Sequence, residues 1–65
     1  MNREELANLI RQLEDYRIAH QHTYSELADV LGVPRVTLLK WIDSGHIPRP
    51  QTVQRIEEFL RLRAP

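Results

Sequence analysis

The chain has 65 residues with nine basic and nine acidic side chains and a 42% hydrophobic content, which is the composition of one small globular domain spanning residues 1–65. It contains no cysteine, which excludes disulfide bonds and thiolate metal sites. The apolar runs are too short for a membrane span, and the polar, acidic N-terminus is unlike a signal peptide, so we expect a cytoplasmic protein.

The charges are distributed unevenly along this neutral chain. Residues 1–30 carry three basic and six acidic side chains, whereas residues 31–65 carry six basic and three acidic ones. Zero net charge counts against a nucleic-acid binder, but an electropositive end could attract phosphate while the acidic end turns away from it. The same pattern also fits two ordinary solvated helix faces.

The first predicted helix covers about residues 3–19. Asn2 and Glu5 have the spacing of a capping box, in which each side chain satisfies a backbone amide of the other residue. Behind them, apolar residues recur at intervals of three and four, as on one face of a helix. These residues are Leu6, Leu9, Ile10, Leu13 and Tyr16.

The second predicted helix covers about residues 24–31. Thr23 and Glu26 form another capping box at its start. Gly32 marks its end, because glycine readily adopts the left-handed conformation that closes many helices. The apolar seam of this helix consists of Leu27, Ala28 and Leu31.

The third predicted helix covers about residues 34–44. Proline is well tolerated at the first helical position, so we expect the helix to begin at Pro34, and Gly45 follows its end. At about 100° per residue, this helix has two distinct faces. One face, expected in the core, contains Leu38, Trp41 and Ile42, and the other contains Val36, Leu39, Lys40 and Asp43.

The fourth predicted helix covers about residues 52–62, after a loop in which Pro48 and Pro50 interrupt helical hydrogen bonding. Its apolar seam consists of Val53, Ile56, Phe59 and Leu60. Alternation typical of strands is absent from the sequence, so the predicted fold class is all-α. We expect a compact four-helix domain.

The middle two helices have the features of a helix-turn-helix. Ala28 leaves room for the following helix to approach, Gly32 makes the turn, and Val33 can fill the space beneath it. The outward face of the third helix combines aliphatic and basic side chains. Such a face suits a DNA major groove, where Val36 and Leu39 can meet thymine methyl groups and Arg35 or Lys40 can donate to guanine.

The whole arrangement resembles the helix-turn-helix family of phage lambda repressor and Cro, also called the XRE type. The resemblance covers about residues 13–60 and rests on the spacing of Leu27-Ala28, Leu31-Gly32-Val33, Leu38 and Trp41, followed by a glycine, an Arg-Pro pair and a fourth helix. It implies a lambda-repressor-like fold. It also implies base contacts from Arg35, Val36, Leu39 and Lys40, and phosphate contacts from Thr23, Tyr24, Thr37, His46 and Arg49.

Four positions depart from the family pattern, and one of them is Pro34, which replaces the serine or threonine that often starts the third helix. Tyr24 replaces a glutamine that contacts the DNA backbone, although a phenol can also donate to phosphate. Gln21 replaces a glycine between the first two helices. Leu39 stands where a polar residue is common, which leaves room for a protein partner at this surface.

Taken together, these features predict a small bacterial or phage-type transcriptional regulator, a repressor, that binds double-stranded DNA. One helix-turn-helix reads few bases, so we expect a homodimer on a palindromic operator. The alternative is a protein-interaction module that binds its partner through Val36 and Leu39. We expect no enzymatic activity, cofactor or small-molecule ligand, because no catalytic or phosphate-binding motif occurs.

The three histidines are weak evidence for a metal site. His20 and His22 form a His-x-His pair, and His46 lies far away in the sequence. Zinc sites usually need three or four convergent ligands at recognised spacings, so we expect no metal.

Overall fold

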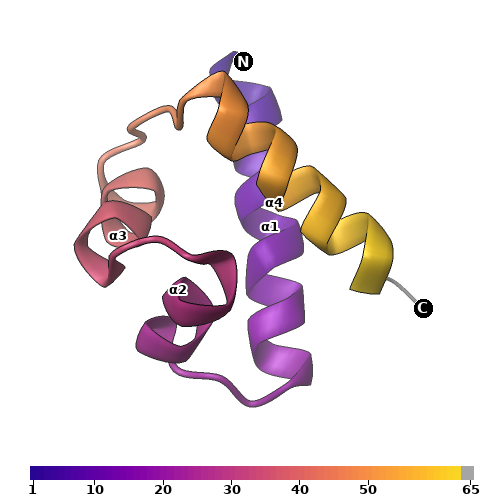
Figure 1. Ribbon diagram of the computed structural model, residues 1–65. Coiled ribbons are helices and arrows are strands. Elements are labelled where there is room, and N and C mark those ends of the chain that lie inside the picture. Colours follow the sequence, from indigo (N-terminus) through magenta and orange to yellow (C-terminus); the bar gives the residue numbers. More distant parts are fainter. Residues whose placement is uncertain (64–65) are drawn as a thin grey trace.

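The computed structural model describes residues 1–63, so the last two residues of the predicted domain lie outside the described part. Four helices follow one another: α1 (Arg3–Ala19), α2 (Tyr24–Leu31), α3 (Arg35–Asp43) and α4 (Pro50–Arg63). No strand occurs in residues 1–63, and the predicted all-α, four-helix fold is confirmed. The short helices α2 and α3 lie together on one side of the longer pair α1 and α4 (Figure 1).

Both predicted capping boxes are present. At α1, the Glu5 amide donates to Asn2 Oδ1 at 2.8 Å, and the Asn2 amide donates to Glu5 Oε1 at 3.4 Å. At α2, the Glu26 amide donates to Thr23 Oγ1 at 3.1 Å, and the Thr23 amide donates to Glu26 Oε1 at 2.8 Å. These bonds satisfy backbone donors that the helix leaves free at its N-terminus, so both helices start where the local sequence indicates.

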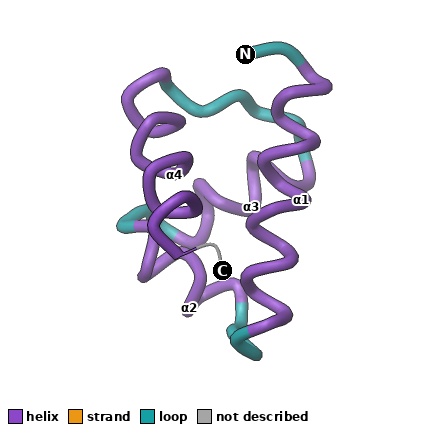
Figure 2. The backbone as a smooth tube through the Cα atoms, turned by 90° about the vertical axis from the view of Figure 1, so that its right-hand side faces the viewer, coloured by secondary structure: helices purple, strands orange, loops and turns teal. Residues whose placement is uncertain are grey.

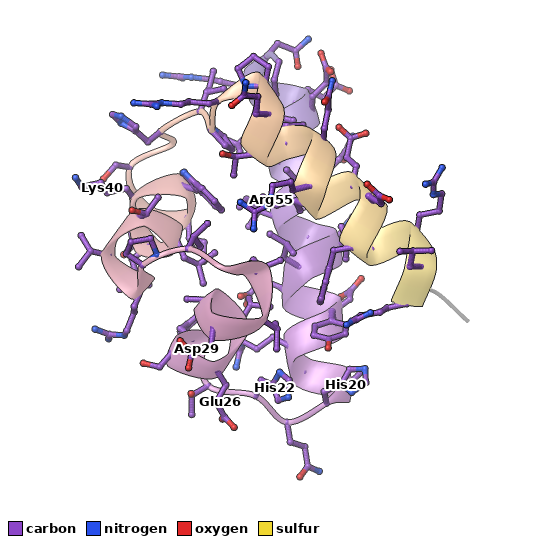
Figure 3. The ribbon with its side chains drawn as sticks, viewed as in Figure 1. His20, His22, Glu26, Asp29, Lys40 and Arg55 are labelled. Carbon is purple, nitrogen blue, oxygen red and sulfur yellow. The ribbon has the colours of Figure 1, made fainter. Side chains whose placement is uncertain are left out.

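Gly32 ends α2 in a conformation that favours glycine. Its φ of 73° is left-handed, which disfavours any residue with a Cβ atom. A Cβ atom at this position would also lie only 2.8 Å from Arg55 Nη2 of α4. The guanidinium of Arg55, labelled in Figure 3, thus covers the C-terminal end of α2, a helix that has no basic residue in its own last turn. Its positive charge lies next to the negative end of the α2 dipole and interacts favourably with it.

The prolines shift two helix starts from their predicted positions. Pro34 is the N-cap of α3, with an extended ψ of 145°, so the helix begins at Arg35 and not at Pro34. Pro50 is the first residue of α4, two residues earlier than predicted, because the Val53 amide already bonds to Arg49 O at 2.9 Å. Proline supplies no amide donor, and the first helical position needs none. The same property suits the N-cap and first positions, so sequence alone placed both prolines incorrectly.

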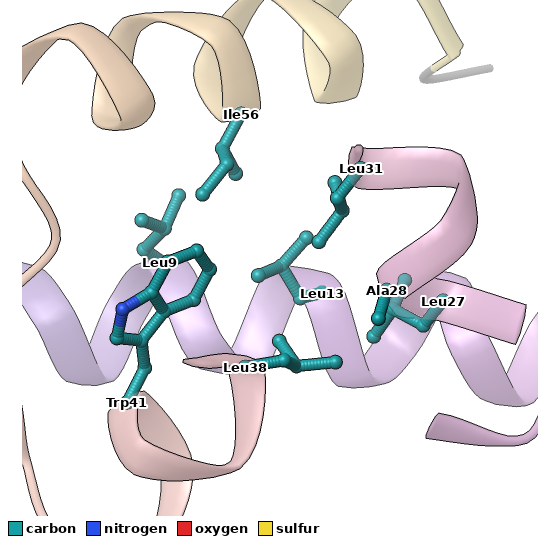
Figure 4. Packing of buried hydrophobic residues seen from close by; sticks show 8 residues of the cluster. All are labelled: Leu9, Leu13, Leu27, Ala28, Leu31, Leu38, Trp41 and Ile56. Carbon is teal, nitrogen blue, oxygen red and sulfur yellow. The ribbon is translucent and has the colours of Figure 1, made fainter. Parts of the chain in front are cut away.

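The hydrophobic core lies where all four helices converge (Figure 4). Its buried cluster consists of Leu9, Leu13, Leu27, Ala28, Leu31, Leu38, Trp41 and Ile56. Half-buried residues that were also predicted from the sequence to lie in the core pack around this cluster. They are Ile10, Tyr16, Ile42, Phe59 and Leu60. Trp41 is only 4% exposed, so the core fixes the inner face of α3 and thereby decides which side chains α3 presents outward.

Candidate nucleic-acid interface

The outward face of α3 is basic and aliphatic, as the sequence predicts. Arg35, Val36 and Lys40 are exposed, with Val36 exposed to 61%. Figure 3 shows Lys40 on the side of α3 that points away from α1 and α4. Leu39 is half-buried, because it lies at the edge between the two helix faces and not at the centre of the outward one.

The N-terminus of α3 adds to the positive character of this face. Pro34 provides no side-chain cap, and the first turn of α3 contains no acidic residue. The first amides of the helix are therefore left without an intrahelical partner, next to the exposed guanidinium of Arg35. Free amides and the positive end of the helix dipole both favour an anion such as a phosphate group.

The N-terminus of α2 is far more constrained. Thr23 uses its hydroxyl oxygen to cap the helix, and its backbone amide donates to the Glu26 carboxyl, which lowers the pKa of that carboxyl. The Tyr24 hydroxyl donates to Glu14 Oε2 of α1 at 3.1 Å. In this arrangement the Tyr24 proton is already committed, so a phosphate group would have to displace Glu14 in order to accept it.

Arg17 of α1 completes this cluster, and sequence reasoning gave it no role. Its Nε and Nη2 donate to Glu14 at 3.3 and 3.4 Å, and its Nη1 donates to the His22 carbonyl at 3.1 Å. Its guanidinium carbon also lies 4.4 Å from the centre of the Tyr24 ring, within the range of a cation–π interaction. We call Glu14, Arg17 and Tyr24 the junction cluster, because it joins the end of α1 to the start of α2.

The junction cluster also changes the acidity of its members. Burial raises the pKa of Tyr24, and the hydrogen bond and negative charge of Glu14 raise it further, while Arg17 opposes the shift. Hydrogen bonding to Glu14 raises the pKa of Arg17. The spacing of Glu14 and Arg17 within α1 is a readable signal for an ion pair, whereas Tyr24 comes from another helix and could not be connected to them from sequence.

The loop between α3 and α4 holds the remaining predicted contact residues. The His46 amide bonds to Lys40 O at 3.2 Å, which folds the start of this loop back against the end of α3. His46 and Arg49 are both exposed, whereas Thr37 on α3 is half-buried. The structure therefore exposes Val36 and Lys40 on one helix face and Arg35 in the first turn of the same helix, with His46 and Arg49 in the loop that follows it.

The other two histidines belong to an aromatic cluster at the end of α1. The Tyr16 ring lies 4.2 Å from the His20 ring, 5.8 Å from the His22 ring and 5.0 Å from the Phe59 ring, measured between centroids. Within residues 1–63, no group of three or more potential ligands is arranged to hold a metal ion. The described helices also include none that is long and apolar enough to cross a membrane.

The sequence matches the profile of a helix-turn-helix family over residues 13–64, which is most of the chain. The match spans α2, α3 and α4 together with the second half of α1. The chain belongs to this family. Its helix-turn-helix is of the XRE or lambda repressor-like type, and the family is one of DNA-binding regulators. Neither the curated proteins nor the solved structures gave a match.

In this helix-turn-helix protein, α2 and α3 form the bihelical unit. Membership of the family confirms the resemblance to lambda repressor and Cro that the sequence suggested. It leaves the individual contact residues, the oligomeric state and the direction of regulation as proposals.

Proposed function

We propose that this helix-turn-helix protein is a sequence-specific transcriptional repressor that acts by occupying an operator in the bacterial or phage-type cytoplasm. The observation that carries the proposal is the division of α3 into two faces. Leu38 and Trp41 are buried in the core, while Val36 and Lys40 are exposed on the opposite side and Arg35 is exposed in the first turn. A rigidly held helix with an outward basic and aliphatic face can enter the major groove as a unit.

Within this proposal, the outward side chains of α3 read the bases. Arg35 and Lys40 donate to guanine, while Val36 and Leu39 contact thymine methyl groups. Phosphate contacts come from the start of α2, from α3 and from the loop that follows α3: Thr23, Tyr24, Thr37, His46 and Arg49. The exposure of His46 and Arg49 beside the end of α3 supports their part in this assignment.

Tyr24 needs a rearrangement to make its proposed contact. Its hydroxyl proton is bound to Glu14, so a phosphate group must either displace that carboxylate or bind to the backbone amides of the same turn. In the second case the junction cluster positions α2. Tyr24 contributes to that cluster through its ring, which packs beneath Arg17.

We propose that two copies bind a palindromic operator, because paired half-sites about 34 Å apart increase both affinity and specificity. Ile18 and Leu62 are exposed to 62% and 69%, and exposed aliphatic residues of this kind are available for self-association. Sedimentation of the protein with a palindromic duplex tests this arrangement. Two copies per duplex are expected, and a single copy would contradict it.

A second candidate function is binding of a protein partner through the same face. The high exposure of Val36, next to the half-buried Leu39, favours this alternative, because these aliphatic residues can pack in a protein interface. The two functions differ in their response to salt. Phosphate contacts release counterions and weaken with a log–log slope of roughly −0.9 per contact, whereas an aliphatic contact responds little.

Selection from a random duplex library tests the proposed function. The wild-type protein should enrich a palindromic motif, and the double variant Arg35→Ala, Lys40→Ala should lose that enrichment. The matched control is Arg11→Ala, Arg61→Ala, which removes the same charge from exposed positions on α1 and α4 and should retain enrichment. An absence of enrichment at low salt would reject DNA reading and favour the protein partner.

A further inference from the structure

A groove of about 660 Å³ runs between α1 and α4. The apolar side chains of Leu9 and Leu60 line it, and the carboxylates of Glu5, Glu57 and Glu58 lie along it beside Arg61 and the N-terminal residue Met1. The Glu5 side chain also caps α1, so Glu57 and Glu58 are the carboxylates most available to a partner. We call this surface the acidic groove.

The acidic groove faces away from α3. On α1, Ala7 and Ile10 line a separate hollow together with Trp41 of α3, whereas Glu5 and Gln12 line the acidic groove together with α4. At about 100° per residue, these two pairs of α1 positions point in nearly opposite directions. Figure 2 views the molecule from the side opposite α3, with α4 on the left and α1 on the right.

The outward face of α3 has the chemistry that the acidic groove lacks. It presents Lys40 and Val36, an aliphatic side chain that is 61% exposed, together with the carboxylate of Asp43, and the cation Arg35 is exposed in the first turn of the helix. Within residues 1–63, neither of these cations forms a salt bridge. The chain as a whole is neutral, so two copies experience no net repulsion that would keep these opposite surfaces apart.

We propose that, in the absence of DNA, the Arg35–Lys40 face of α3 docks into the acidic groove of a second copy of this chain. Glu57 and Glu58 pair with Arg35 and Lys40, and Val36 packs toward Leu60. Because the two surfaces lie on opposite sides of the molecule, the contact is head-to-tail and extends into open chains. A single short helix buries little area, so the association is weak and sensitive to salt.

This contact occupies the surface that the proposed function assigns to DNA. Self-association and DNA binding therefore compete, and the protein withdraws its own recognition helix as its concentration rises. It differs from the two-copy arrangement on an operator, in which both α3 faces remain free for DNA. Only the competition rests on the proposed function, since the docking itself depends on charge and exposure alone.

Sedimentation velocity over a concentration series tests the docking. At low salt the average mass of the wild-type protein should rise with concentration, and at high salt it should return to that of a monomer. A wild-type protein that remains monomeric at low salt would overturn the proposal.

Charge reversal identifies the two surfaces. Glu57→Lys, Glu58→Lys should weaken association roughly tenfold or more, because like charges then meet across the contact. The control Asp15→Lys, Asp29→Lys introduces the same charge change at exposed positions outside the groove and should associate more strongly than the groove variant. Equal association of the groove and control variants would overturn the assignment.

A pair of variants with complementary charges tests the contact by restoring association, so that the test does not depend only on the loss of association in one variant. Arg35→Glu, Lys40→Glu should also fail to associate alone, and mixing it with Glu57→Lys, Glu58→Lys should restore association, because the reversed surfaces again attract each other. A mixture that stays monomeric would contradict the pairing. Adding the duplex selected from the random library to the wild-type protein should dissolve the chains; persistence of the chains would reject the competition while leaving the docking itself supported.

Discussion

The outward face of α3 and the junction cluster handle their polar groups in opposite ways. In the junction cluster, Glu14 accepts hydrogen bonds from both Arg17 and Tyr24, and Arg17 also donates to a backbone carbonyl. On α3, Arg35 and Lys40 form no salt bridge within residues 1–63. The junction cluster fixes the relative position of two helices, whereas the α3 face keeps its hydrogen-bonding capacity for a ligand.

The buried side of α3 should produce the largest effect on stability. Trp41→Ala removes a large side chain from the core and should cost about 3–5 kcal/mol, comparable with the whole stability of a domain of this size. Urea unfolding followed by circular dichroism measures the loss. Val36→Ala on the opposite side should change stability by less than about 0.5 kcal/mol, and similar losses in the two variants would contradict the division into faces.

The exposed side of α3 should show the reverse pattern. Arg35→Ala should weaken binding to the selected operator by about 1–3 kcal/mol, which is roughly 5- to 150-fold, while leaving the urea midpoint unchanged. Fluorescence anisotropy with a labelled duplex measures the affinity. An unfolding midpoint that falls together with the affinity would show that Arg35 supports the fold and does not read DNA.

Much of this fold is predictable from local sequence. The capping boxes of Asn2 and Thr23 and the glycine at position 32 act within one turn, and the ends of α1 and α2 agree with prediction. The predicted start of α3 was one residue too early and that of α4 two residues too late. A proline, which has no amide donor, fits the N-cap and the first helical position equally well.

The contacts that sequence did not predict join separate helices. Tyr24 meets Glu14 ten residues earlier in the chain, and Arg55 approaches Gly32 from another helix. Helical periodicity shows which face a residue occupies but not what that face meets. The outward side of α3 was predictable for this reason, since exposure needs no partner, whereas the commitment of the Tyr24 hydroxyl was not.

The junction cluster should produce a smaller effect that depends on pH. Tyr24→Phe removes one partly exposed hydrogen bond and should cost about 1 kcal/mol or less at neutral pH. Because the pKa of Tyr24 is higher in the folded state, its contribution is complete below the unfolded pKa of about 10 and is lost as pH rises through the folded value. The variant should therefore lose less stability than the wild-type protein between neutral and alkaline pH.

Urea midpoints measured from neutral to alkaline pH check the role of the Tyr24 phenol. Tyr16→Phe is the control, because within residues 1–63 the Tyr16 hydroxyl is not hydrogen-bonded to Glu14 or another carboxylate. It should keep the alkaline decline of the wild-type protein. An unchanged decline in Tyr24→Phe would contradict the assigned role of the junction cluster.

The smallest expected effect concerns the turn that leads into the junction cluster. Gln21 has a left-handed φ of 55°, a conformation that costs a residue with a Cβ atom about 1–2 kcal/mol. Gln21→Gly removes this strain but gives the unfolded chain more freedom, so a net gain of about 0.5 kcal/mol is expected in urea unfolding. Gln12→Gly within α1 should instead destabilise the protein, and a loss in both variants would argue against strain at Gln21.

The affinity for DNA, compared between the wild-type protein and an α3 variant across a salt series, tests most directly whether the outward face of α3 is the DNA-binding surface. Affinity for the selected operator should be measured over a series of salt concentrations for the wild-type protein and for Arg35→Ala, Lys40→Ala. The wild-type log–log plot should be steep, with about −0.9 for each phosphate contact, and the variant should bind more weakly because it has lost its base-reading cations. Equal affinities for the two proteins throughout the series would contradict the account and place the DNA contact elsewhere on the molecule.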